Sequence, residues 1–151
     1  MELSSLKNTK LFSKRISKII EPGDILFLYG EIGVGKTTFV RFLINQLEVE
    51  NKIEKSDILS PTFNIVYDYQ IKKNKILHYD LYRLKNNKDI LELGMFDIHD
   101  NYIKIIEWPE LIRPKPRDRI EMYFKYSKIK DSRNVEIKGF GKWEKYKFRE
   151  A

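Results

Sequence analysis

The 151-residue chain is predicted to fold as a single α/β domain in which helices flank a mixed β-sheet. Apolar runs of strand length alternate with amphipathic helical segments in the N-terminal half, a pattern typical of this class. Farther along, strand-like runs at 63–70 and 76–79 are separated only by a polar turn. Since a purely parallel sheet needs a helix between successive strands, this hairpin predicts that the sheet also contains antiparallel pairs.

The first third of the chain is predicted to contain two helices with one strand between them. Ser4 or Ser5 is placed to cap the first helix, and apolar residues then recur on one helical face. The expected elements, in order, are a helix over 5–20, a turn at 21–24, a strand over 25–29, a helix from 36 to about 47 and an exposed, charged connection over 48–57.

The remainder of the chain is predicted to be rich in strands. Alternating apolar residues, polar turns and two prolines mark the element boundaries. The expected elements are an antiparallel hairpin of 63–70 and 76–79 around a turn at 72–75, a short helix over 87–93 stopped by Gly94, a strand over 103–106, a loop at Pro114 and Pro116, and strands over 120–126, 134–138 and around 143–148. The tail after about residue 139 carries no recognisable motif.

Composition limits the function classes without naming a partner. The chain has no cysteine, which excludes disulfides and thiolate metal sites and fits a reducing cytoplasm. It has no apolar run of membrane length and no secretory leader, so we expect a cytoplasmic protein without a membrane partner. The net charge of +7 leaves nucleic-acid binding open, although the lysines are spread along the chain.

The octet Gly30–Thr37, Gly-Glu-Ile-Gly-Val-Gly-Lys-Thr, carries the strongest chemical signal. It has the spacing of a phosphate-binding loop, in which glycines let backbone N–H groups surround phosphate oxygens. In such a loop Lys36 reaches the β- and γ-phosphates and the Thr37 hydroxyl binds Mg²⁺. The pattern therefore predicts a P-loop NTPase-like fold that binds ATP with Mg²⁺. The plain alternative is a glycine-rich turn that binds nothing.

Two carboxylates are placed to complete a magnesium site beside this loop. Asp80 and Glu107 each follow an apolar strand, and ligands of open α/β sheets gather at the carboxyl ends of strands. We therefore expect both to lie near Thr37 if their strands run parallel to Ile25–Tyr29. His78, inside a predicted strand, is expected to be a packed or hydrogen-bonded histidine, and His99 has no assigned role.

Four stretches resemble the TsaE (YjeE) family of small bacterial ATPases when they are taken together in this order. They are Gly30–Phe39, Ser60-Pro61-Thr62-Phe63, His78-Tyr79-Asp80-Leu81-Tyr82-Arg83-Leu84 and Glu107-Trp108-Pro109. The resemblance extends from about residue 5 to residue 137.

The resemblance implies an ATPase that uses Mg²⁺ and supports formation of threonylcarbamoyladenosine at position 37 of tRNAs reading codons that begin with A. It implies two protein partners, a threonylcarbamoyl transferase subunit and its paralogue, of the TsaD and TsaB type, with tRNA reached through the complex. It makes Lys36, Asp80 and Glu107 catalytic and puts Thr37, Glu107 and Asp80 at the metal. The nucleotide-binding residues it implies are Thr9, Glu31, Ile32, Gly33, Val34, Gly35, Lys36, Thr37, Thr38, Thr62, Trp108 and Arg133.

Two other classes stay open at the level of sequence. A small-molecule P-loop kinase would need a lid rich in arginine, for which Arg113, Arg117 and Arg119 are the candidates. A basic nucleic-acid-binding module would leave the loop incidental and would bind tRNA in a salt-sensitive way.

Overall fold

A seven-stranded sheet forms the centre of the molecule in the computed structural model, which describes residues 1–96, 101–129 and 132–148. The strand order is β1-β7-β6-β2-β5-β4-β3. The strands are β1 (Glu2–Leu3), β2 (Ile25–Tyr29), β3 (Val66–Ile71), β4 (Asn74–Asp80), β5 (Ile103–Glu107), β6 (Arg119–Tyr126) and β7 (Arg133–Phe140). The helices are α1 (Leu6–Ser17), α2 (Lys36–Glu50) and α3 (Asn87–Glu92), with 3₁₀ turns at Pro109–Leu111 and Gly141–Trp143.

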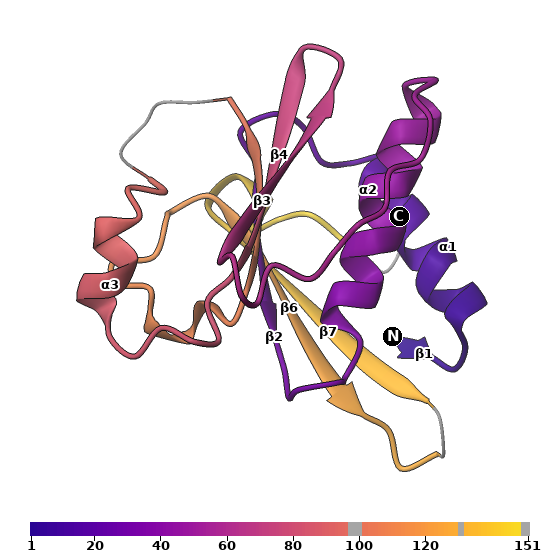
Figure 1. The fold of residues 1–151 in the computed structure, drawn as a ribbon. Coiled ribbons are helices and arrows are strands. Elements are labelled where there is room, and N and C mark those ends of the chain that lie inside the picture. Colours follow the sequence, from indigo (N-terminus) through magenta and orange to yellow (C-terminus); the bar gives the residue numbers. More distant parts are fainter. Residues whose placement is uncertain (97–100, 130–131, 149–151) are drawn as a thin grey trace.

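The predicted mixed sheet is confirmed. Strands β6, β2, β5 and β4 are parallel neighbours, whereas β3, β7 and β1 join through antiparallel pairs. Because the four central strands are parallel, their carboxyl ends meet at one edge of the sheet, and the loop from β2 to α2 begins there, beside β6 and β7 (Figure 1). Ligands of open α/β sheets gather at the carboxyl ends of the strands, so a ligand is expected at this end of the sheet.

Helices cover the two faces of the sheet unequally. Helices α1 and α2 pack on one face and the shorter α3 lies on the other (Figure 1). The larger core lies under α1 and α2, where Phe12 packs against Phe39 with ring centroids 5.1 Å apart. Ser5 caps α1 by accepting a hydrogen bond from the Asn8 amide, as expected. Among the described residues, no helix combines the length and the apolar character that a membrane crossing requires.

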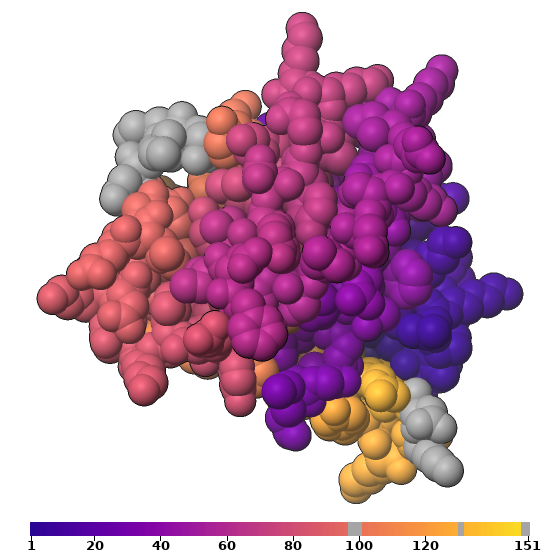
Figure 2. Space-filling model, in the orientation of Figure 1, coloured from indigo at the N-terminus to yellow at the C-terminus, as the bar shows by residue number. Residues whose placement is uncertain are grey.

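The connection after α2 differs from its prediction. Helix α2 continues to Glu50, and Glu48 is buried rather than exposed, because its carboxylate accepts hydrogen bonds from Asn45 and from the amide and hydroxyl of Ser56. Arg41 also donates to the Ile58 carbonyl at 2.8 Å. These hydrogen bonds hold the connection against α2. The segment that then leads into the β3–β4 hairpin covers the middle of the face seen in Figure 2.

Three predictions about strands are wrong. Strand β4 begins at Asn74, inside the turn predicted over 72–75. Strand β3 begins at Val66 and not at Phe63, because Ile65 takes a left-handed backbone conformation (φ 67°) and Phe63 is exposed to solvent. The stretch around 143–148 is not a strand. A 3₁₀ turn ends at Trp143 instead, and both Trp143 and Phe148 pack onto the large core. His99 lies outside the described residues.

Gly30, the first residue after β2, allows a close approach between the loop and the sheet. Its φ is 137°, and a Cβ at this position would clash with the carbonyl oxygen of Phe124 in β6. Only glycine fits both conditions without strain. The glycine therefore brings the loop to its place beside β6.

We expect Gly30→Ala to lower the free energy of unfolding by about 3 kcal/mol, because a strained backbone angle and an overpacked contact each cost about 1–3 kcal/mol. Urea unfolding of the purified protein measures this. Gly35→Ala is the matched control, since Gly35 also has a positive φ (111°) but no atom within 4 Å of the added Cβ. Equal losses in the two variants would show that the contact with β6 does not matter.

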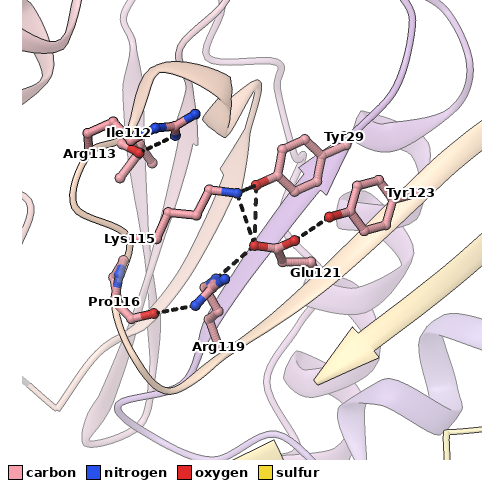
Figure 3. A network of polar contacts seen from close by, with 8 residues as sticks. All are labelled: Tyr29, Ile112, Arg113, Lys115, Pro116, Arg119, Glu121 and Tyr123. Carbon is pink, nitrogen blue, oxygen red and sulfur yellow. Dashed lines mark hydrogen bonds and ion pairs between the residues drawn. The ribbon is translucent and has the colours of Figure 1, made fainter. Parts of the chain in front are cut away.

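The buried carboxylate of Glu121 contacts the last residue of β2, the strand that leads into the loop. Glu121 of β6 accepts hydrogen bonds from Arg119 (2.7 Å), Lys115 (3.2 Å) and Tyr123, and at 3.4 Å from Tyr29, the last residue of β2 (Figure 3). The Tyr29 and Tyr123 rings stack with centroids 4.7 Å apart. The network connects β2, β6 and the loop at Lys115.

Burial raises the pKa of the Glu121 carboxyl, but the hydrogen bonds from Tyr123, Arg119 and Lys115 outweigh it, so the pKa lies below its ordinary value of 4.5. A lowered pKa in the folded state stabilises the protein above pH 4.5, and this contribution is lost as the pH falls through the folded value. We expect Glu121→Gln to cost about 2 kcal/mol at pH 7 and to lose less stability than the parent between pH 5 and 3.

Thermal unfolding across that pH range measures the effect. Glu136→Gln is the control, since Glu136 lies on β7 with its side chain 55% exposed. The role given to Glu121 is wrong if its variant and the parent lose stability in parallel on acidification.

Candidate nucleotide site

The loop between β2 and α2 turns through two glycines that have positive φ angles. Gly33 and Gly35 have positive φ angles of 73° and 111°, which let the chain turn tightly before α2. Helix α2 starts at Lys36 with Gly35 as its N-cap, so no side chain caps its first N–H groups. Uncapped N–H groups and the positive end of the helix dipole favour an anion at this point.

Lys36 is almost fully buried and is folded back over the loop. Its ammonium donates to the carbonyl oxygens of Gly30 (2.5 Å) and Glu31 (3.0 Å) and lies 3.8 Å from the centroid of the Trp108 ring. Burial lowers the pKa of the ammonium, and the carboxylates of Glu107, Glu110 and Asp80 oppose that shift. The ammonium therefore lies against the loop itself.

Thr37, in the first turn of α2, contacts Glu107 at the end of β5. This proximity was expected if β5 runs parallel to β2, as it does. The Thr37 hydroxyl lies 2.9 Å from one carboxylate oxygen of Glu107 and 3.1 Å from the other. Glu107 ends β5, which is parallel to β2, and its carboxylate is buried. Nε2 of His78 lies 2.8 Å from Oε1 of Glu107, the oxygen that the Thr37 hydroxyl approaches at 2.9 Å, so the histidine is hydrogen-bonded as expected.

Asp80 ends β4 directly beside Glu107, since the two residues are register partners. One carboxylate oxygen accepts from the Thr62 hydroxyl at 2.6 Å, and the other accepts from the Tyr82 amide at 3.0 Å. The Ser60 and Thr62 hydroxyls lie 2.9 Å apart. Asp80 thus holds the loop around Thr62 against the acidic end of the sheet.

Two adjoining cavities open on either side of the loop. The first, of about 250 Å³, has Lys36, Thr37, Thr62, Asp80 and Glu107 among its lining residues. The second, of about 280 Å³, is lined in part by Thr9, Val34 and Arg133. The residues common to both are Gly33, Gly35 and Thr38. Carboxylates and hydroxyl groups line the first cavity. The second cavity lies between α1 and β7.

Almost all the predicted site residues line one of these cavities. Ile32 and Trp108 belong to the first, whereas Glu31 lines neither and contributes only its carbonyl to Lys36. Leu3, Ser5, Leu6 and Phe124 also line the second cavity and were not predicted as site residues. Leu3 belongs to β1, whose pairing with β7 is too short to detect from the sequence, and just after it Ser5 caps α1 and Leu6 begins that helix. Tyr82, also lining the first cavity, stood inside a recognised motif without an assigned role.

The oxygen donors of this site fit Mg²⁺ better than a softer metal. Carboxylate and hydroxyl oxygens are its usual protein ligands, and it keeps several waters while bound to one or two carboxylates and to phosphates. Within residues 1–96, 101–129 and 132–148, no three histidine, cysteine or acidic side chains gather closely enough to enclose a metal by themselves. The arrangement therefore suits a metal shared with a phosphate ligand.

The parallel central strands, the glycine-rich turn into α2 and the acidic strand ends define a P-loop NTPase-like α/β protein. The sequence profile of the family described as threonylcarbamoyl adenosine biosynthesis protein TsaE matches residues 3–135. The chain belongs to this family, which confirms the resemblance found in the sequence.

Known relatives agree with this assignment. The tRNA threonylcarbamoyladenosine biosynthesis protein TsaE of Rickettsia prowazekii is 40% identical over 111 residues, which are 74% of this chain and 74% of that protein. The protein of the same name from Aquifex aeolicus is 35% identical over 118 residues, or 78% of this chain and 80% of that protein. The crystal structure of Bacillus subtilis YdiB matches the fold with a TM-score of 0.74 at 24% identity, covering 99% of this chain and 90% of that one.

Proposed function

We propose that this chain is a Mg²⁺-dependent ATPase subunit that supports formation of N6-threonylcarbamoyladenosine at position 37 of tRNAs reading codons that begin with A. The observation that carries the proposal is the convergence of Lys36 and the Thr37–Glu107 pair on one cavity. Membership of the TsaE family supplies the biological setting. In this proposal the protein works in the cytoplasm, where tRNA is modified.

The described side chains divide the work of binding and hydrolysing a nucleotide. Lys36 exchanges its carbonyl partners for the β- and γ-phosphates, and the loop amides hold the same oxygens. The Thr37 hydroxyl and the Glu107 carboxylate would hold Mg²⁺, with Asp80 beside them. Mg²⁺, when bound, neutralises charge that develops on the phosphates. Asp80, anchored by Thr62, would accept a hydrogen bond from the attacking water.

The second cavity suits the nucleoside end of the ligand. Thr9 and Val34 form part of its wall, and Arg133 brings a cation from the edge of β7. Trp108, whose ring lies against Lys36, would flank the phosphates. With the phosphates in the first cavity and the nucleoside in the second, Thr9, Trp108 and Arg133 each have a role, although their assignment rested on the family resemblance alone.

Two partners complete the proposal, a threonylcarbamoyl transferase subunit and its paralogue, of the TsaD and TsaB type. The ATPase does not carry out the transfer, and tRNA is reached through the complex. Slow hydrolysis by the isolated chain is expected if the partners supply catalytic groups in trans.

Reconstituted tRNA modification tests this function. The partners and unmodified tRNA are combined with ATP, with or without this chain, and modified adenosine is measured over many turnovers together with released phosphate. We expect sustained modification only when the chain is present. Unchanged modification without the chain contradicts the proposal. Transfer of the γ-phosphate to a small molecule would instead favour the kinase, and salt-sensitive tRNA binding that ignores Lys36→Ala would favour the nucleic-acid module.

A further inference from the structure

His78 is a buried histidine that contacts the candidate magnesium ligand. It lies in β4, is fully buried, and pairs with Ile105 of the neighbouring strand. Glu107 is two residues beyond Ile105, so His78 and Glu107 are diagonal neighbours on one face of the sheet. Nε2 of His78 lies 2.8 Å from Oε1 of Glu107.

The surroundings of the imidazole define its hydrogen-bonding role. An ionised carboxylate can only accept hydrogen bonds, so Nε2 carries a proton and donates it to Glu107. Nδ1 is buried and has no hydrogen-bond partner among the described residues. A proton on Nδ1 would leave a buried donor unpaired, which is costly. Nε2 is therefore the nitrogen that donates to Glu107.

The Glu107 carboxylate is consequently contacted by two residues. Thr37 contacts both carboxylate oxygens, and His78 contacts Oε1. Thr37 is itself a candidate metal ligand, because its hydroxyl donates its hydrogen to Glu107 and keeps its lone pairs for a metal. The contact with His78 comes from the sheet and does not depend on the metal.

We propose that His78 is a positioning residue that orients the Glu107 carboxylate for Mg²⁺. This rests on the proposed function, and specifically on the metal role of Glu107. Groups that hydrogen-bond metal ligands orient them, and their loss typically lowers metal affinity about 10–100-fold. Without this bond, Glu107 samples other rotamers and offers its oxygens to the metal for a smaller fraction of the time.

Equilibrium binding of a fluorescent ATP analogue to the full chain, titrated with Mg²⁺ and repeated in EDTA, tests the proposal. We expect His78→Leu to raise the Mg²⁺ concentration at the midpoint at least 10-fold, while affinity in EDTA changes less than twofold. His78→Gln, whose amide can reach the position of Nε2, is expected to stay within about threefold of the parent. His78→Asn, which is shorter, is expected to behave like His78→Leu.

A merely structural role would change different quantities. It would weaken binding in EDTA and in Mg²⁺ alike, and His78→Gln would not restore the midpoint. Adding His78→Leu to Glu107→Gln should shift the midpoint no further, because both changes act through one carboxylate. An unchanged midpoint in His78→Leu, or a fully additive double variant, overturns the proposal. A parent protein whose nucleotide binding ignores Mg²⁺ overturns the metal assignment itself, which separates the two failures.

Discussion

Replacing Lys36 with alanine is expected to lower the rate of ATP hydrolysis by at least about 100-fold. The ammonium is the cation that the structure places at the phosphate loop, hydrogen-bonded to Gly30 and Glu31. Loss of one well-placed donor to the charge of a transition state typically costs a factor of 100–1,000. Phosphate release by the reconstituted complex at saturating ATP measures the effect.

Lys7→Ala is the matched control, since Lys7 is an exposed lysine on α1 that lines neither cavity. It should hydrolyse ATP at the parent rate. The melting temperatures of both variants show whether the fold survives, because Lys36 is itself buried. A folded Lys36→Ala protein that retains more than a tenth of the parent rate would contradict the assigned role.

Replacing Glu107 with glutamine is expected to reduce turnover by about 100-fold at saturating Mg²⁺, while ATP binding changes only a few-fold. Glutamine keeps the size of the side chain and can still accept a hydrogen bond, but it removes the charge that would hold the metal. Because the loop amides and Lys36 remain, the nucleotide keeps most of its contacts. Turnover and equilibrium binding measured on the same preparations separate the two effects.

Glu92→Gln, at an exposed position at the end of α3, controls for the loss of one negative charge. Glu107→Ala is the harsher variant, since it also leaves Thr37 and His78 without their shared acceptor. If Glu107→Gln hydrolyses ATP at the parent rate, the metal lies elsewhere.

The apolar pattern of the sequence predicted a strand correctly where burial on both faces of the sheet requires apolar residues throughout. The run at 25–29 is apolar throughout because β2 lies between two parallel strands and is covered on both faces, and its bounds were predicted without error. The start of β3 was misplaced because the apolar alternation continues through Ile65, whose backbone turns away. The stretch at 143–148 is rich in aromatic residues, as many strands are, yet Trp143 ends a 3₁₀ turn and Phe148 packs on the core outside any strand.

The site was predictable to the extent that its residues lie in motifs. Lys36 and Thr37 follow from loop spacing, and Glu107 from its place after a strand. The contact between His78 and Glu107 was not predictable, because it depends on the register of β4 against β5. The cavity near Thr9 likewise depends on how α1 packs, which no local pattern encodes.

The position of Lys36 links two motifs that lie far apart in the sequence. Its ammonium contacts the carbonyl oxygens of Gly30 and Glu31 and also the ring of Trp108, which directly follows β5. A change in the conformation of either motif therefore alters the surroundings of the same ammonium, so the glycine-rich loop and the turn after β5 communicate through one side chain.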